Sequence, residues 1–201
     1  NIHRSSVQGI LKDDLHFHPY KIQLLQFLKP GDYELRKKYC ETMMNMFWDE
    51  GGLDKILFSD EAHFHLEGYV NKQNCRFWAP ANPKEKHEKQ LHSKKATVWC
   101  AISSSGIIRP YFYEDARGRS ITVNSQRYCE MICTFFVPAL QNFPGYDPNS
   151  TWFQQDGAMA HTTTASMTSL RELFPGVLVF RFGDIPFPPR SPDLTPLDFF
   201  L

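Results

Sequence analysis

The order of apolar and polar positions along the chain predicts several strands followed by alternating helices and strands. Residues 55–60 form a short apolar run typical of a buried strand, and residues 62–70 alternate as its partner strand would. A turn rich in serine and glycine separates two further predicted strands, 96–102 and 107–113. The remaining elements follow in the order helix 125–141, strand 151–155, helix 161–174, strand 177–182 and a last helix from about residue 196. This order predicts an α/β fold, a mixed sheet with helices packed against it.

The first fifty residues have a helical pattern. Residues 4–12 predict a short helix with a serine start signal and with Val7, Ile10 and Leu11 on its apolar side. Residues 17–31, with a proline near each end, are interpreted as a linker. We interpret residues 32–50 as an amphipathic helix whose methionines and aromatic residues belong to the core.

The polar side of the first predicted helix has two interpretations. It could be the second helix of a helix-turn-helix motif that faces a DNA groove, or it could be an ordinary surface helix. The side chains that would face the groove are Ser5, Ser6, Gln8 and Lys12. The pattern of this helix does not decide between the two interpretations.

The charge of the chain is balanced overall but uneven along its length. The 201 residues contain 22 basic and 22 acidic side chains, so the net charge alone predicts no nucleic-acid partner. Residues 71–95, however, contain seven basic and two acidic side chains. The basic residues are Lys72, Arg76, Lys84, Lys86, Lys89, Lys94 and Lys95. They predict either a surface for DNA phosphates or a solvated lysine-rich loop.

Several classes of protein are disfavoured by composition. The five cysteines form no CxxC pair, which argues against a disulfide framework and against a structural zinc site. No apolar run of about 18 residues and no signal segment is present, so we expect a soluble intracellular protein without a membrane partner. Hydrophobic residues make up 42% of the chain, enough for a substantial core. The chain begins without methionine and ends within an apolar run, and we interpret it as a fragment of something longer.

Three aspartates are the strongest candidates for chemistry. Asp60 and Asp156 end apolar, strand-like runs, and Asp198 follows Thr195 and Pro196 in the first turn of the last predicted helix. Hard cations such as Mg²⁺ prefer carboxylate oxygens, and two ions about 3.5–4 Å apart can clamp the attacking and leaving oxygens of a phosphodiester. The three aspartates therefore predict metal-dependent cutting and joining of nucleic acid. Solvated carboxylates at loop ends, and a capping box formed by Thr195 and Asp198, are the alternatives.

The motifs around these aspartates resemble a known family. The segments 59–61 (Ser-Asp-Glu), 154–158 (Gln-Gln-Asp-Gly-Ala, followed by His161) and 191–198 (Ser-Pro-Asp-Leu-Thr-Pro-Leu-Asp) occur in the order found in mariner-type cut-and-paste transposases. The resemblance to this family of the DDE/D superfamily is strong over residues 55–201 and looser over residues 1–50. It implies a ribonuclease H-like fold.

The resemblance also implies a mechanism and a site. Asp60, Asp156 and Asp198 would hold two Mg²⁺ or Mn²⁺ ions, water would attack the phosphodiester at a transposon end, and the freed 3′-hydroxyl would attack target DNA. His161 would orient a phosphate or a metal-bound water, or cap the following helix. The implied partners are transposon terminal inverted repeats, target DNA and a second copy of the chain as a homodimer, and the implied location is the nucleus.

The resemblance assigns domains as well. Residues 1–30 would be the end of a helix-turn-helix DNA-binding region and a linker, and residues 31–201 a catalytic domain truncated in its last helix. Residues 71–95 would be a basic insertion that reaches DNA and the second subunit, with Lys72, Arg76, Lys94 and Lys95 as contacts. The stretch from Asp156 to Asp198 is longer than is common in the family, and a proline-rich loop over 183–190 accounts for this.

Some residues near the motifs are expected to stay outside the site, and other functions are possible. Glu61 should turn away from Asp60 because successive strand side chains alternate. His63 and His65 lack a third ligand at a telling spacing, so a structural role is predicted for them. The alternative functions are a transposase-derived DNA-binding protein without catalytic activity, and a ribonuclease-type hydrolase of the same fold.

Overall fold

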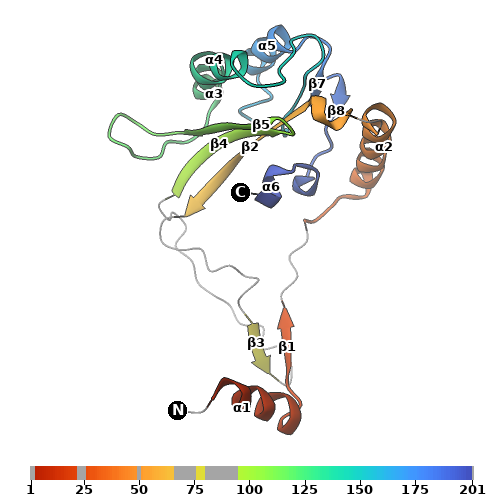
Figure 1. Ribbon diagram of the computed structural model, residues 1–201, viewed down its shortest axis with the longest axis vertical. Coiled ribbons are helices and arrows are strands. Elements are labelled where there is room, and N and C mark those ends of the chain that lie inside the picture. Colours follow the sequence, from red (N-terminus) through yellow and green to blue (C-terminus); the bar gives the residue numbers. More distant parts are fainter. Residues whose placement is uncertain (1–2, 22–25, 49–50, 66–75, 80–94, 201) are drawn as a thin grey trace. The chain divides into compact units, whose positions relative to one another are not determined.

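The computed structural model describes residues 3–21, 26–48, 51–65, 76–79 and 95–200 (Figure 1). The chain divides into two compact units. The first unit consists of Asn1–Leu25 and His65–Lys94, and the second of Gln26–Phe64 and Lys95–Leu201. None of the helices in the described ranges is long and apolar enough to cross a membrane.

The first unit contains a short helical segment and a two-stranded sheet. Helix α1 (Arg4–Gly9) continues as the π-helical turn η1 (Ile10–Asp14), which confirms the helix predicted here. The ring of His3 caps α1 by accepting the backbone N–H of Ser5. Val7 and Ile10 are exposed, so the predicted apolar side is not buried. Strand β1 (His18–Lys21) pairs antiparallel with β3 (Arg76–Ala79), so the segment interpreted as a linker includes a strand.

The second unit is built on a six-stranded mixed sheet with the order β5-β4-β2-β6-β7-β8. Its strands are β2 (Ile56–His65), β4 (Lys95–Ser103), β5 (Gly106–Phe112), β6 (Trp152–Gln154), β7 (Leu178–Phe180) and β8 (Ile185–Pro186). Strands β4 and β5 are antiparallel, whereas β2, β6, β7 and β8 pair in parallel. The predicted mixed α/β sheet is therefore confirmed.

Helices cover both faces of this sheet. Those of the second unit are α2 (Pro30–Phe47), η2 (Leu53–Lys55), α3 (Ser125–Met131), η3 (Ile132–Phe136), α4 (Val137–Gln141), α5 (Thr164–Leu173), η4 (Pro192–Leu194) and α6 (Leu197–Phe200). Figure 1 shows α3, α4 and α5 gathered over one face. On that face Leu57 and Phe153 belong to one core cluster, while Ile56 and Val179 join Tyr39 of α2 in a second cluster on the other face.

Aromatic side chains fill the larger of the two clusters. Phe153 of β6 stacks on Phe174 with ring centroids 4.9 Å apart, and Phe136 packs against Trp99 at 5.1 Å. All four rings are fully buried. Burial of a large apolar side chain stabilises a fold by about 1.5–3 kcal/mol, so this cluster anchors α3, α4 and α5 to the sheet.

Three predicted elements differ from the structure. Strand β2 continues to His65 because no turn residue interrupts it, so residues 62–65 extend this strand instead of starting a partner strand, and Asp60 lies inside a strand. The proline-rich segment expected to be a loop contains β8. In α2, Tyr39 and Phe47 are buried as predicted, but Tyr33, Met44 and the C-cap residue Trp48 are exposed.

Candidate active site

Strand register brings Asp60 and Asp156 together. Strands β2 and β6 are parallel, and Phe58 pairs with Gln154. Because side chains alternate with a period of two along a strand, residues two positions further on leave the same face of the sheet at the same level. Asp60 and Asp156 are these residues, just beyond the last paired positions, where β6 has ended and the chain opens into a loop.

Asp198 completes the group from a different element. It lies in the first turn of α6, where its backbone N–H donates to the carbonyl of Thr195 at 3.2 Å. All three aspartates line one pocket of about 340 Å³. The rest of the lining includes Gly157, Ala158, Arg181, Arg190, Ser191, Thr195 and residues 187–189.

The three carboxylates of the pocket influence one another's pKa. Burial, followed by repulsion from Asp198 and from other neighbouring carboxylates, raises the pKa of Asp60 to about 7. The backbone N–H of Glu61 donates to Asp60 at 2.7 Å and opposes this rise. Burial and the charge of Asp156 also raise the pKa of Asp198. Three carboxylates that repel one another around one pocket offer oxygen ligands of the kind that a hard cation prefers.

A capping role for Asp198 is not supported by these contacts. A capping carboxylate accepts a backbone N–H near the start of its helix, which lowers its pKa. Within the described ranges the Asp198 carboxylate accepts no hydrogen bond, and its pKa is raised. Its side chain is therefore available to a ligand in the pocket.

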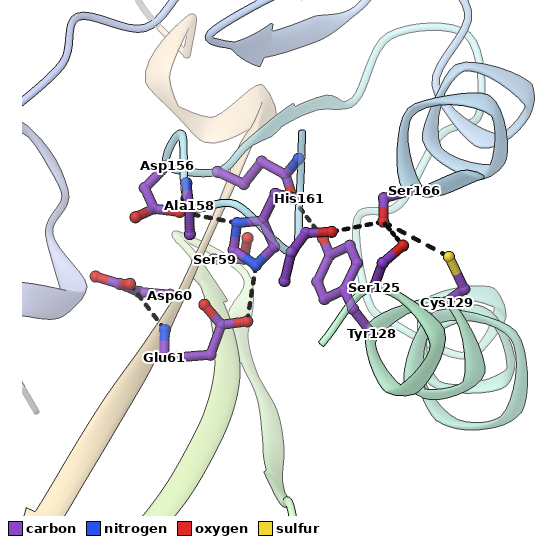
Figure 2. A network of polar contacts seen from close by, with 12 residues as sticks. Ser59, Asp60, Glu61, Ser125, Tyr128, Cys129, Asp156, Ala158, His161 and Ser166 are labelled. Atoms are coloured by element: carbon purple, nitrogen blue, oxygen red, sulfur yellow. Dashed lines mark hydrogen bonds and ion pairs between the residues drawn. The ribbon is translucent and has the colours of Figure 1, made fainter. Parts of the chain in front are cut away.

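His161 joins Asp156 to Glu61 (Figure 2). Its Nδ1 lies 2.8 Å from Asp156 Oδ1, and its Nε2 lies 3.1 Å from Glu61 Oε1. The ring is buried, with 3% of its surface exposed. Burial opposes a positive charge, but the two carboxylates outweigh it and raise the pKa of His161 to about 10. At neutral pH this pKa favours the imidazolium, which can donate from both nitrogens.

The same contact sets the state of Asp156. Burial alone would raise its pKa, but the hydrogen bond and charge of His161, with the Ala158 N–H at 3.0 Å, lower it. Asp156 thus stays ionised at neutral pH, whereas Asp60 titrates near 7. The pKa values of these two neighbouring carboxylates differ because, among the described residues, Asp156 has a cationic partner and Asp60 has none.

Residues of α3 and α5 hold His161 in place. The ring of Tyr128 packs on the imidazole with centroids 4.3 Å apart, and its hydroxyl donates to Gln155. The N-cap of α5 is Thr163, whose hydroxyl accepts the Ser166 N–H, so His161 does not cap this helix. Figure 2 shows Ser166 bonded to Ser125 of α3 beside Tyr128.

Glu61 is the residue whose role was not predicted. As expected, it points away from Asp60, but on the opposite face of β2 it meets His161. Glu61, Asp156 and His161 have ligand atoms within 4.8 Å of one another, so the cluster could hold a metal ion once His161 has lost its proton. Alternation along the strand indicated the direction of Glu61, whereas its partner lies 100 positions away in the sequence.

The predicted DNA-binding residues have varied positions. Ser6, Gln8 and Lys12 are exposed on α1 and η1, and Ser5 bonds to His3 at 2.7 Å. Lys95 is exposed at the start of β4. Lys72 and Lys94 lie outside the described residues, and for Arg76 only the strand β3 is described.

Arg181 is a further basic residue at the pocket. A side chain on Gly157 would meet Arg181, because an added Cβ there would lie 3.2 Å from Arg181 Cδ. Glycine at position 157 therefore leaves room for the arginine to cross the loop that follows Asp156. Arg181 also lies over the ring of Phe182, at 5.1 Å, and within the described ranges it forms no ion pair.

Neither a protein-family model nor a curated protein matches this chain. Solved structures do match. The catalytic domain of Mos1 mariner transposase has a TM-score of 0.61 at 22% identity, over 88% of this chain and 71% of that chain. The Mos1 transposase paired-end complex with left transposon end has a TM-score of 0.64 at 21% identity, over 98% of this chain and 55% of that chain. The Mos1 catalytic domain with Raltegravir and Mg has a TM-score of 0.58 at 22% identity, over 86% of this chain and 70% of that chain.

These matches establish the fold. The order β5-β4-β2-β6-β7 in a mixed sheet flanked by helices is ribonuclease H-like, as in the Mos1 catalytic domain, and the resemblance read from the motifs is confirmed at this level. The chain spans about 55% of the length of the protein chain in the transposon-end complex.

Proposed function

We propose that this chain is the catalytic part of a mariner-type DNA transposase, which cuts DNA at transposon ends and joins the freed strand to target DNA. The observation that supports this most strongly is the convergence of Asp60, Asp156 and Asp198 on one pocket of a ribonuclease H-like fold. Two of these carboxylates are matched by strand register and the third comes from α6. The sequence motifs that surround them occur in the order typical of the family.

The residues of the pocket suit a divalent cation. Carboxylate oxygens are the ligands that Mg²⁺ and Mn²⁺ prefer. The mutual repulsion that raises the pKa of Asp60 to about 7 would be relieved by a bound cation. One or two such ions, when bound, would lower the pKa of a water molecule and stabilise the charge that develops on the phosphodiester oxygens.

The residues at the site have separate roles in this proposal. Asp60, Asp156 and Asp198 hold the cations and fix their positions. His161 keeps Asp156 ionised and oriented through the bond at 2.8 Å. Arg181, at the edge of the pocket, contacts a DNA phosphate and brings the scissile bond toward the carboxylates.

Partners and location follow from the same proposal. One matching structure contains Mos1 transposase with a left transposon end. By analogy we propose that this chain binds the terminal inverted repeats of its own element, acts as a homodimer and works in the nucleus, where its substrate is found. The exposed Gln8, Lys12 and Lys95 are candidate DNA contacts.

The test is cleavage of a labelled DNA duplex with Mg²⁺ or Mn²⁺. We expect nicking by the wild-type chain and a loss of more than about 100-fold in D60N, D156A and D198N, since they remove ligands and not only their supports. The matched control is D54N, which changes an exposed aspartate of η2 in the same unit. It should cleave as the wild type does.

A chain that binds DNA without cleaving it would contradict this proposal. Retained binding in the absence of nicking, with both cations, would identify a transposase-derived DNA-binding protein. Cleavage that persists in D156A would show that another site or a contaminating nuclease is responsible.

A further inference from the structure

Residues 190–195, the segment that leads to Asp198, contact helix α2 through two arginine–carboxylate pairs. Arg190 donates from Nε to Asp32 Oδ2 at 2.6 Å and from Nη2 to Asp32 Oδ1. Arg36 donates from Nη1 and Nη2 to the two oxygens of Asp193, at 2.8 and 2.5 Å. Both pairs are bidentate, a geometry that fixes orientation as well as distance. Arg190 belongs to the segment, and Arg36 belongs to the helix.

A third connection ties the same segment to the sheet. Tyr39 of α2 donates its hydroxyl to Gln154 Oε1 at 2.7 Å, and Gln154 Nε2 donates to the carbonyl of Leu194 at 3.1 Å. Gln154 is the last residue of β6, is fully buried and precedes Asp156 by two positions in the sequence. The helix, the strand that leads to Asp156 and the segment that leads to Asp198 thus share one network.

The backbone of the segment depends on this network. Arg190 has a φ of 55°, in the left-handed region that non-glycine residues rarely adopt. Such a conformation persists where surrounding contacts impose it. Its partner Asp32 is buried, with 3% of its surface exposed, whereas the Arg190 side chain is partly exposed.

We propose that α2 is a positioning element for Asp198, and that Asp193 is an anchor for the segment and not a metal ligand. Asp198 follows residues 190–195 closely, in the first turn of α6, and in the described part of the chain its carboxylate accepts no hydrogen bond. Its position is therefore set by residues 190–195, which the two arginine pairs hold on α2. This inference rests on the proposed function, because it gives Asp198 a cation to hold.

Charge reversal of the more exposed pair tests the inference. Mn²⁺ binding to the whole chain is measured by calorimetry in the wild type, R36D, D193R and the double variant R36D/D193R. We expect each single variant to bind Mn²⁺ about 10–100-fold more weakly, as is usual when the support of a metal ligand is lost. The double variant restores an ion pair of opposite polarity, and most of the affinity should return.

A second arginine–aspartate pair provides the matched control. Arg119 Nε and Nη2 lie 2.8 and 2.7 Å from one oxygen of Asp115, Oδ2, and neither residue lines the pocket. R119D and D115R should bind Mn²⁺ as the wild type does. Circular dichroism and urea unfolding show whether each variant is folded. If the reversals unfold the chain, R36K and R190K replace them, because lysine keeps the charge but loses the planar fork.

The outcomes separate this inference from the proposed function. Wild-type affinity in R36D and D193R, or in the folded lysine variants, would overturn the positioning role while leaving the metal site intact. Weak Mn²⁺ binding in R36D and D193R that does not recover in R36D/D193R would overturn the positioning role as well. The loss of affinity would then not come from the broken ion pair. Absence of Mn²⁺ binding in the wild type, or equal binding in D156A, would instead contradict the metal site and the proposed function with it.

Discussion

Replacement of Asp60 by asparagine is expected to stabilise the chain above neutral pH when no divalent cation is present. Asparagine removes the charge but keeps an Oδ1 that can accept the Glu61 N–H, which lies 2.7 Å from the aspartate oxygen. The variant therefore isolates the cost of ionising a carboxylate in this pocket. The shape of the side chain and its hydrogen bond with the Glu61 N–H are kept in this variant.

The size of the effect follows from the pKa of Asp60. Burial and the neighbouring carboxylates raise this pKa from 3.8 to about 7. A group whose pKa is raised on folding favours the folded state fully below its unfolded pKa, and this contribution is lost as the pH rises through the folded pKa. One pKa unit corresponds to about 1.4 kcal/mol, so the loss between pH 4 and 8 is on the order of 4 kcal/mol.

Urea unfolding of the wild type and D60N in EDTA measures this loss. The free energies of unfolding should be close at about pH 4, and D60N should be the more stable protein at about pH 8. Added Mn²⁺ should narrow the difference, because a cation at 100 times its Kd stabilises the protein that binds it by about 2.7 kcal/mol. A difference that does not change with pH, or a D60N protein less stable at pH 8 in EDTA, would refute the reasoning.

Three further variants test other parts of the account. H161A should destabilise the fold by about 3–5 kcal/mol at pH 7, since it leaves the largely buried carboxylate of Glu61 without its cationic partner. Urea unfolding measures this loss, and because the pKa of His161 is raised from 6.5 to about 10, the wild-type advantage should be full below pH 6.5 and fall as the pH rises toward 10. R181Q should lower the slope of log K against log salt for DNA binding by about 0.9, the effect of one lost phosphate contact; an unchanged slope would remove Arg181 from the interface. F136A should cost about 3–5 kcal/mol in urea unfolding, because its ring is fully buried among Trp99 and Phe153.

Local sequence patterns predicted most of the ribonuclease H-like fold. The apolar runs that became β4, β5, β6 and β7 are short and end at turn residues, so alternation alone marked them. The end of β2 was misplaced because the acidic pair Asp60 and Glu61 interrupts its apolar pattern without any turn residue. Strand β1 could not be predicted, since its partner β3 lies far along the chain and its own four residues include a proline.

For the candidate site, too, features that depend on local sequence could be predicted and long-range contacts could not. The three aspartates were selected from motifs, and the strand register explains why two of them meet. The contacts that support them join residues distant in sequence: Asp32 and Arg190 are 158 positions apart, and Glu61 and His161 are 100 apart. A charged residue on a helix face or a strand has many possible partners, and only the folded chain selects one.

The most direct measurement of the central claim is a crystal structure of the chain soaked in Mn²⁺, with data collected at a wavelength where manganese scatters anomalously. We predict an anomalous peak in the pocket bounded by Asp60, Asp156 and Asp198, at coordination distance from carboxylate oxygens. A peak confined to Glu61, Asp156 and His161, or no peak at a saturating concentration, would contradict the claim that the three aspartates form the cation site.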